Sequence, residues 1–398
     1  MSDISEQHEY EEEYEYSSAS EDEQGFEVTN EGIPEEADND ASNGFFGHTG
    51  ALFAVDVSTS SKTPYLVCSG GEEGVGILHL FDTNDVIAHL EGPTDSINII
   101  KFSPDGARVA MASMDGNVYI YDVPEITEDY EAESILLNPT FIASGPEDEL
   151  EWMTWHPSSK ALACGGADSL AWVFTVLTDK VSVYRAFSGH TGAIITGKFS
   201  PNGKLLITGG ADGAMYKWTI AEDSGVKLIG HELAGNEYPL ITALCIPTDN
   251  IAIVGTDDGQ LILVNLSTMK KVSSFNTNLI STIENVEYDT TTNKFIAADV
   301  DGNFCVIDPT NATVVGSGNY EEGGITALTT RYGKFIACCT DGSVLLGDVR
   351  AASIETTYVG HRDMAVSLAT TCDVLKYPFV ITAGEDGAVY VFNLNAKY

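Results

Sequence analysis

Basic residues are scarce in this sequence. It contains 19 lysines and arginines against 60 aspartates and glutamates, which gives a formal net charge of −41 over 398 residues. The first base is Lys62, residues 1–42 hold 16 acids, and the rest of the chain still has 44. A negative field of this strength repels nucleic acid and anionic membranes. We therefore expect neither as a direct partner, and a positively charged ligand instead.

Paired cysteines and long apolar runs are also missing. The seven cysteines form no Cys-x-x-Cys pair and show no zinc-type spacing with histidine, and most lie in apolar runs such as KFIACCTDG. We therefore expect buried, reduced thiols, no metal and no other cofactor. The acidic N-terminus is unlike a signal peptide, and no apolar run is long enough to cross a membrane. The sequence thus predicts an intracellular protein, in the cytoplasm and also in the nucleus.

The N-terminal segment differs in composition from the rest. Residues 1–42, with stretches such as HEYEEEYEYSSASEDE, are too charged to bury a core and are predicted to be a disordered acidic tail. Two roles are open for it: it extends the capture of a cationic partner, or it keeps unsuitable cations away. Residues 43–398 are predicted to be the folded domain.

After Asn43 the chain repeats one pattern. The clearest copy, GHTGAIITGKFSPNGKLLITGGADGAMYKW, reads as a Gly-His loop and three strands separated by a Pro-Asn-Gly and an Asp-Gly turn. The acid of the second turn recurs at intervals of 40–53 residues, as Glu73, Asp115, Asp168, Asp212, Asp258, Asp301, Asp341 and Asp386. This period predicts an all-β fold, an eight-bladed β-propeller. We expect each Asp-Gly pair to form a two-residue hairpin turn with both residues at positive φ.

The Gly-His and Asp-Gly elements resemble the WD-repeat family. The resemblance implies a buried, hydrogen-bonded structural tetrad formed by His190, Thr208, Asp212 and Trp218, and a second formed by His361, Thr382 and Asp386 with Phe392 in place of tryptophan. Most of the other units are expected to keep only the acid. Because each Asp can orient a His within its own blade, we interpret these residues as structural and not as catalytic.

Closure of the ring gives an independent check on the number of blades. Each unit supplies three strands, and the following segment supplies the outer one, for example KVSVYRAF, KKVSSF and SIETTYV. The eighth unit ends the chain without an outer strand, whereas NGFFGH at 43–48 has no blade of its own. We expect that N-terminal segment to complete the eighth blade and remove the last exposed edge.

Acidic residues concentrate in the connections that a propeller of this type gathers on one face. We expect them to form an acidic bowl at the mouth of the central channel, which focuses the field and suits a flexible Lys/Arg-rich peptide. The candidate binding residues are Asp95, Asp148, Glu149, Glu151, Glu284, Glu321, Glu322, Asp363 and Glu385. Trp152 and Tyr238 are possible packing partners for such a peptide, although for Trp152 we favour a place in the core. No nucleophile, phosphate-loop or zinc motif is present, so we expect a protein that is not an enzyme.

The segment LEWMTWHPSSKALACGGADSLAWVF narrows the resemblance. With TIENVEY at 282–288, VITAGEDGAVYVF at 380–392 and an acidic N-terminal extension, it is similar to the family of angio-associated migratory cell protein and its fungal counterpart, an acidic ribosome-assembly chaperone. The resemblance covers residues 45–394. It implies a dedicated escort for a newly made large-subunit ribosomal protein (number ten in eukaryotic naming, sixteen in the universal scheme). The basic N-terminal segment of that client would lie on the acidic face of an eight-bladed propeller.

Two other functions stay open at this point. An acidic histone escort would use the same charges, and a WD-repeat scaffold or adaptor in signalling or ubiquitin ligation would use other surfaces. In every case we expect a monomer.

Overall fold

The structure is a computed structural model. It describes residues 39–58, 60, 63, 65–126, 134–146, 148–222, 224–228, 239–371 and 379–394. Residues 1–38 of the predicted tail, Glu147, Tyr238 and Cys372 lie outside the described residues.

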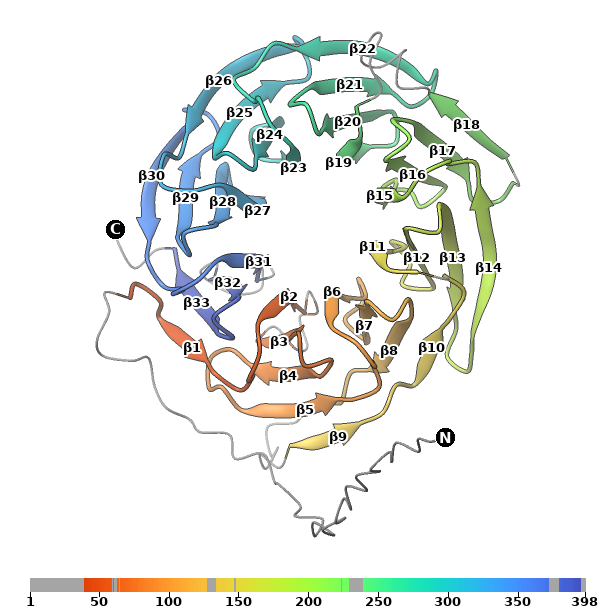
Figure 1. Ribbon diagram of the computed structural model, residues 1–398, viewed down its shortest axis with the longest axis vertical. Helices are drawn as coiled ribbons and strands as arrows, with labels where there is room; N and C mark the ends of the chain where they lie inside the picture. Colours follow the sequence, from red (N-terminus) through yellow and green to blue (C-terminus); the bar gives the residue numbers. More distant parts are fainter. Residues whose placement is uncertain are drawn as a thin grey trace, which may run out of the picture.

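Eight sheets, antiparallel except for one added strand in blade 1, are arranged in a ring around a central axis, as Figure 1 shows. The predicted all-β, eight-bladed propeller is therefore confirmed, and the described part of the chain contains no helix. Each sheet is one blade, and we name its strands a, b, c and d from the channel outward. The first four blades are as follows: blade 1, β2 (Leu52–Val57), β3 (Leu66–Gly71), β4 (Gly76–Leu80) and β5 (Val86–Leu90); blade 2, β6 (Ile97–Phe102), β7 (Arg108–Ser113), β8 (Val118–Asp122) and β10 (Phe141–Ala143); blade 3, β11 (Leu150–Trp155), β12 (Ala161–Gly166), β13 (Leu170–Val176) and β14 (Val181–Ser188); blade 4, β15 (Ile194–Phe199), β16 (Leu205–Gly210), β17 (Met215–Thr219) and β18 (Ser224–Leu228).

The second half of the ring follows the same plan, and the predicted outer strands are found where they were expected. The blades are as follows: blade 5, β19 (Ile241–Thr248), β20 (Ile251–Thr256), β21 (Leu261–Asn265) and β22 (Lys270–Phe275); blade 6, β23 (Ile283–Asp289), β24 (Lys294–Asp299), β25 (Asn303–Asp308) and β26 (Thr313–Asn319); blade 7, β27 (Ile325–Arg331), β28 (Lys334–Cys339), β29 (Val344–Asp348) and β30 (Ser353–Tyr358); blade 8, β31 (Ala365–Thr370), β32 (Phe379–Gly384), β33 (Val389–Asn393) and β1 (Asn43–Phe45).

The N-terminal strand closes the ring as predicted. β1 pairs antiparallel with β33, from Asn43 opposite Val391 to Phe45 opposite Val389. The chain is anchored further by the amide of Asp40, which donates to the carbonyl of Val359 over 2.8 Å. Because β1 pairs with the edge of β33, the last blade has four strands like the others.

Blade 1 carries a fifth strand that the sequence pattern did not predict. β9 (Ile135–Leu137) lies parallel to β5, on its outer side. It belongs to the long connection between β8 and β10 of blade 2, which explains why the interval from Asp115 to Asp168 is 53 residues, the longest in the chain.

The hydrophobic core is divided into eight clusters, one in each seam between consecutive blades. The seam that closes the ring packs Val55 and Val67 of blade 1 against Ile381 and Val391 of blade 8. Both faces of every blade are therefore covered, which explains why strands such as β28 (KFIACC) are apolar almost throughout instead of alternating. Six cysteines, all but the undescribed Cys372, are buried and free, as expected.

The turns between strands b and c differ from the prediction of a two-residue hairpin. In each turn only the residue after the acid has positive φ, for example Gly116 at 83° and Ser169 at 63°. The amide of Gly116 donates to the carbonyl of Ser113, and Ser113 in turn donates to Asn117. This pattern is a three-residue loop, a type I turn that ends in a left-handed residue. The acid therefore keeps an ordinary backbone and is free to bond neighbouring amides with its side chain.

Candidate functional site

The b–c turns and the d–a loops form one face of the propeller, which we call the top face. A Cβ at Gly116, in the b–c turn of blade 2, would lie 3.1 Å from the carbonyl oxygen of Asp148, in the loop that enters blade 3. A Cβ at Gly342, in the b–c turn of blade 7, would lie 2.7 Å from the carbonyl oxygen of Asp363, in the loop that enters blade 8. The a–b and c–d connections form the opposite, bottom face.

All nine acids predicted to bind a ligand belong to the top face, and all nine are exposed. Seven are in loops: Asp95 between β5 and β6, Asp148 and Glu149 between β10 and β11, Glu321 and Glu322 between β26 and β27, Asp363 between β30 and β31, and Glu385 between β32 and β33. The other two, Glu151 and Glu284, are the second residues of β11 and β23. The nine residues therefore lie along one arc of the ring, from blade 6 through blades 8 and 1 to blade 3, whereas blades 4 and 5, at the upper right of Figure 1, carry none of them.

Glu151 and Glu284 occupy a special backbone position. In all eight blades the a–b pairing shifts register at the second residue of strand a, which forms a bulge. In three blades the bulge residue is Asn98, Thr242 or Thr326, and its side chain donates to a carbonyl of the next blade. An ionised glutamate has no proton to donate there. Blades 3 and 6 thus place a carboxylate where blades 2, 5 and 7 place a side chain that bonds the next blade.

Both carboxyl groups are partly removed from water. Burial raises the pKa of Glu151, and the negative charge of Glu149 adds to the effect. Burial alone raises the pKa of Glu284. In the free protein, burial disfavours the ionised form of both groups. A cation bound beside either carboxylate would stabilise that ionised form.

The ion pairs of the described bases involve other acids than these nine. On the bottom face the first residue of strand b pairs with the last residue of strand c in three blades: Arg108 with Asp122 at 2.8 Å, Lys294 with Asp308 at 3.3 Å, and Lys334 with Asp348 at 3.0 Å. Inside the channel Lys198 pairs with Glu287 at 3.3 Å. Among the described lysines and arginines, only Lys227 and Arg362 lie toward the top face, and no ion pair joins a described base to any of the nine acids.

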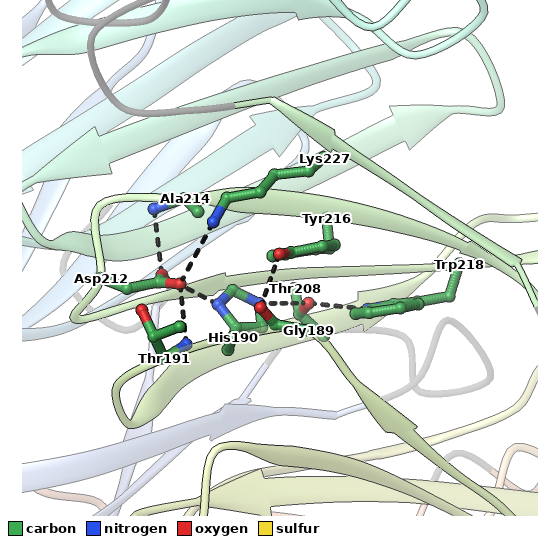
Figure 2. Close-up of polar contacts among 9 residues, drawn as sticks. All are labelled: Gly189, His190, Thr191, Thr208, Asp212, Ala214, Tyr216, Trp218 and Lys227. Atoms are coloured by element: carbon green, nitrogen blue, oxygen red, sulfur yellow. Dashed lines mark hydrogen bonds and ion pairs between the residues drawn. The ribbon is translucent and has the colours of Figure 1, made fainter.

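The frame beneath these acids is held by buried polar chains, one of which is shown in Figure 2. The two ring nitrogens of His190 bond the Asp212 carboxylate at 2.9 Å and the Thr208 hydroxyl at 2.8 Å, and the Trp218 indole donates to the same hydroxyl at 2.9 Å. Asp212 also accepts from the amides of Thr191 and Ala214. The carboxylate thus ties the d–a loop to the b–c turn of the same blade.

Blade 8 repeats this chain. His361 bonds Asp386 at 2.9 Å and Thr382 at 2.8 Å, while Phe392 is fully buried in the tryptophan position.

Blade 1 is an exception among the other blades, most of which were expected to keep only the acid. His48 bonds the hydroxyl of Ser69 at 2.8 Å and lies 3.6 Å from Glu73, which accepts from the amides of Thr49 and Gly50. The signal was present in the sequence: Gly-His precedes this blade too, and Ser69 stands four residues before Glu73 as Thr208 stands before Asp212. Glu73 therefore has a structural role in blade 1.

Comparison with known proteins identifies the repeat. The family described as "WD domain, G-beta repeat" matches residues 84–122 and 181–219. Each match begins in the region of a strand d and ends with strand c of the next blade, so a sequence repeat is offset from a blade by one strand. The same offset leaves the last blade without its own strand d, and β1 takes that place. The chain therefore contains WD40 repeats, set in an eight-bladed propeller.

The WD40 propeller has relatives along almost all of its length. It is 25% identical to angio-associated migratory cell protein from Homo sapiens over 374 residues, which cover 90% of this chain and 81% of the relative. It is 22% identical to ribosome assembly protein SQT1 from Saccharomyces cerevisiae, with 92% and 89% covered. A crystal structure of Chaetomium thermophilum Sqt1, bound to the N-terminus of the ribosomal protein L10, superposes with a TM-score of 0.77 at 20% identity, covering 89% of this chain and all of that one.

The described part of the propeller shows neither a cluster of metal-ligating residues nor a membrane-spanning helix. Within the described ranges, no group of three or more His, Cys, Asp or Glu residues is arranged to hold a metal ion. Nor does the described portion include a helix with the length and apolarity needed to cross a membrane. Trp152 is 6% exposed and packs between blades 3 and 4, which agrees with its interpretation as a core residue.

Replacement of Asp212 by alanine is expected to destabilise the propeller by about 3 kcal/mol, because it leaves His190 and two amides without their acceptor. Burial alone would raise the pKa of Asp212, but the bonds from His190, Thr191 and Ala214 lower it to about 2. Its contribution is therefore complete above the unfolded pKa near 3.8 and is lost as the pH falls toward 2. Asp258→Ala is the matched control, since Asp258 bonds only the side chains of Thr256 and Gln260. Urea unfolding at pH 7 and pH 3 measures both variants; equal losses would contradict the structural role of Asp212.

The double variant Glu151→Gln with Glu284→Gln is expected to raise the melting temperature at pH 7. Because burial raises the pKa of both glutamates, their ionised forms destabilise the folded state at pH 7. The gain in melting temperature should vanish below about pH 4.5, where both glutamates are protonated in the folded and in the unfolded state. Scanning calorimetry at pH 7 and pH 4 tests this. A melting temperature that falls at pH 7 would show that the two charges stabilise the fold.

Proposed function

We propose that this protein is a chaperone that escorts a newly made large-subunit ribosomal protein, of the L10 type, during assembly of the large ribosomal subunit. The basic N-terminal segment of the client would lie on the top face, across the nine acids named above. The observation that carries the proposal is the separation of charge. Carboxylates without an ion pair lie along a continuous arc of one mouth of the channel, while the described bases are mostly on the bottom face or paired inside the channel.

The similarity to Sqt1 supports the identity of the client. That protein is named a ribosome assembly protein, and its structure includes the N-terminus of ribosomal protein L10. The present chain has the same fold and covers almost all of that relative. We extend the partner to this chain because its top face offers the charges that a basic segment requires.

The mechanism we propose is electrostatic shielding without a chemical step. Carboxylates beside low-dielectric walls attract arginine and lysine side chains and form charge-assisted hydrogen bonds, each worth about 1.5–3 kcal/mol net. A shielded segment is kept from aggregating or from binding RNA too early. Ribosomal RNA phosphates then compete for the same side chains and release the client. A protein with this role would act in the cytoplasm and pass into the nucleus, and it would need neither a cofactor nor direct contact with nucleic acid.

The test is a salt titration of binding. A fluorescent peptide with the N-terminal sequence of the organism's own L10 is titrated with the full chain between about 0.05 and 1 M salt, where the screening length falls to about 3 Å. We expect the affinity to fall by at least a factor of about 100. A complex with the same affinity at both ends of the range would contradict electrostatic shielding. The same titration with a basic histone tail distinguishes a histone escort from an escort of the L10-type protein.

A further inference from the structure

A cavity of about 310 Å³ opens on the top face where blades 6, 7 and 8 meet. One charged residue, Glu284, lies at its edge. The apolar part of the lining is Val300, Ile325, Met364 and Val366. A volume of this size is at the lower end for ligand pockets and suits a single long side chain better than a whole small molecule.

The walls of this cavity are tied together across two seams. The side-chain amide of Asn285 in blade 6 donates to the carbonyl of Thr326 in blade 7 over 3.2 Å. The hydroxyl of Thr326 donates in turn to the carbonyl of Ala365 in blade 8. Thr340, also in the lining, accepts from the amide of Gly324 at 2.9 Å. A site with bonded walls is preorganised, so little ordering entropy is lost when a side chain enters.

The charge in this cavity has no partner among the described bases. Burial raises the pKa of Glu284, which reports that the carboxylate is partly desolvated. The larger cavity beside Glu151, of about 540 Å³, is different, because Lys101 and Lys198 also line it and its charges are therefore of both signs. The Glu284 cavity is lined by no lysine or arginine.

We propose that the Glu284 cavity binds one arginine side chain of the basic partner, with its guanidinium on the Glu284 carboxylate and its methylene stem against Val300, Met364 and Val366. Arginine fits better than lysine, because its planar group is less strongly hydrated and pairs with a carboxylate through two hydrogen bonds. The inference deepens the proposed function, since it requires that a basic peptide is bound at the top face.

The experiment fills the cavity without changing any charge. Val366→Phe occupies the space, and Ile195→Phe is the matched control because it makes the same change at the same bulge position of blade 4. We expect Val366→Phe to weaken binding of the L10 peptide by about tenfold and Ile195→Phe to leave it unchanged. Glu284→Gln, which keeps the shape of the side chain, provides a second variant if Val366→Phe does not fold.

The peptide identifies the anchored residue. Each arginine of the probe is replaced singly by citrulline, which has nearly the same shape without the charge. One replacement should weaken binding to the wild-type protein by about tenfold and have no effect on Glu284→Gln. If Val366→Phe and Glu284→Gln both bind the L10 peptide like the wild type, or if no arginine couples to Glu284, the anchor is disproved while the proposed function stands.

A basic histone tail as second probe distinguishes the two failures. If the wild-type protein binds that tail and not the L10 peptide, the proposed function is wrong and the anchor is tested on the tail with the same variants. If neither peptide binds, both proposals are overturned.

Discussion

Deletion of residues 1–45 is expected to abolish cooperative folding of the propeller, whereas deletion of residues 1–38 is expected to leave its melting temperature unchanged. The longer deletion removes β1 and exposes the edge of β33. It also removes Phe45, which is 3% exposed and stacks on the buried ring of His79 at 3.9 Å. Loss of one buried phenylalanine alone costs about 3–5 kcal/mol, a large share of the roughly 5–15 kcal/mol that stabilises a typical protein.

Circular dichroism and calorimetry of the two truncated proteins measure this difference directly. Residues 39–42 stay in the shorter deletion, together with the bond from Asp40 to Val359. If both proteins melt like the full chain, blade 8 does not need its N-terminal strand. If both fail, the acidic segment stabilises the fold, contrary to its interpretation as a separate tail.

Reversal of the two glutamates at the channel mouth is expected to reduce binding of the basic client segment by about 10²–10⁴-fold. Glu151→Lys and Glu284→Lys together remove two charge-assisted contacts of about 1.5–3 kcal/mol each, and every 1.4 kcal/mol is a factor of ten. The control is Asp82→Lys with Asp179→Lys, which changes the net charge equally on the bottom face. Both control residues are exposed in c–d turns.

Peptide titration at moderate salt compares the two double variants. We expect the bottom-face variant to bind within about threefold of the wild type, because screening limits exposed charges to about 10 Å at 0.1 M salt. Equal losses in both variants would mean that only the net charge matters. An unchanged affinity in the top-face variant would favour an adaptor that uses another surface.

Features that repeat along the chain could be predicted from the sequence. The spacing of the turn acids predicted the number of blades, and the unmatched NGFFGH segment predicted the closure by β1. Both depend on local pattern, since strands a, b and c of every blade follow one another directly in the chain. β9 was not predicted because three apolar residues in a long connection do not reveal which edge they will join. The frame of blade 1 was missed because Ser69 and Glu73 differ from the usual threonine and aspartate, although their spacing is the same.

The candidate site could be predicted only in part. Loop position was enough to assign Asp95 and Asp363 to one face, because connections alternate between the two ends of a blade. The cavity beside Glu284 has walls from three blades, from Val300 to Val366, and no local pattern brings those residues together.

Glu284 and Glu287 illustrate the difference between what the sequence determines and what only the tertiary structure decides. They are three residues apart in β23, and the sequence, which singled out Glu284 by its place at the start of the strand, does not show which of the two is paired with a base. Composition and repeat length determined that this protein is a negatively charged ring of eight blades. Only the tertiary structure decided that Glu287 is neutralised by Lys198, 89 residues away, while Glu284 is not paired with any described base. The reason is physical: strand formation depends on neighbours in the chain, whereas the state of a charge depends on what lies within a few ångströms in space.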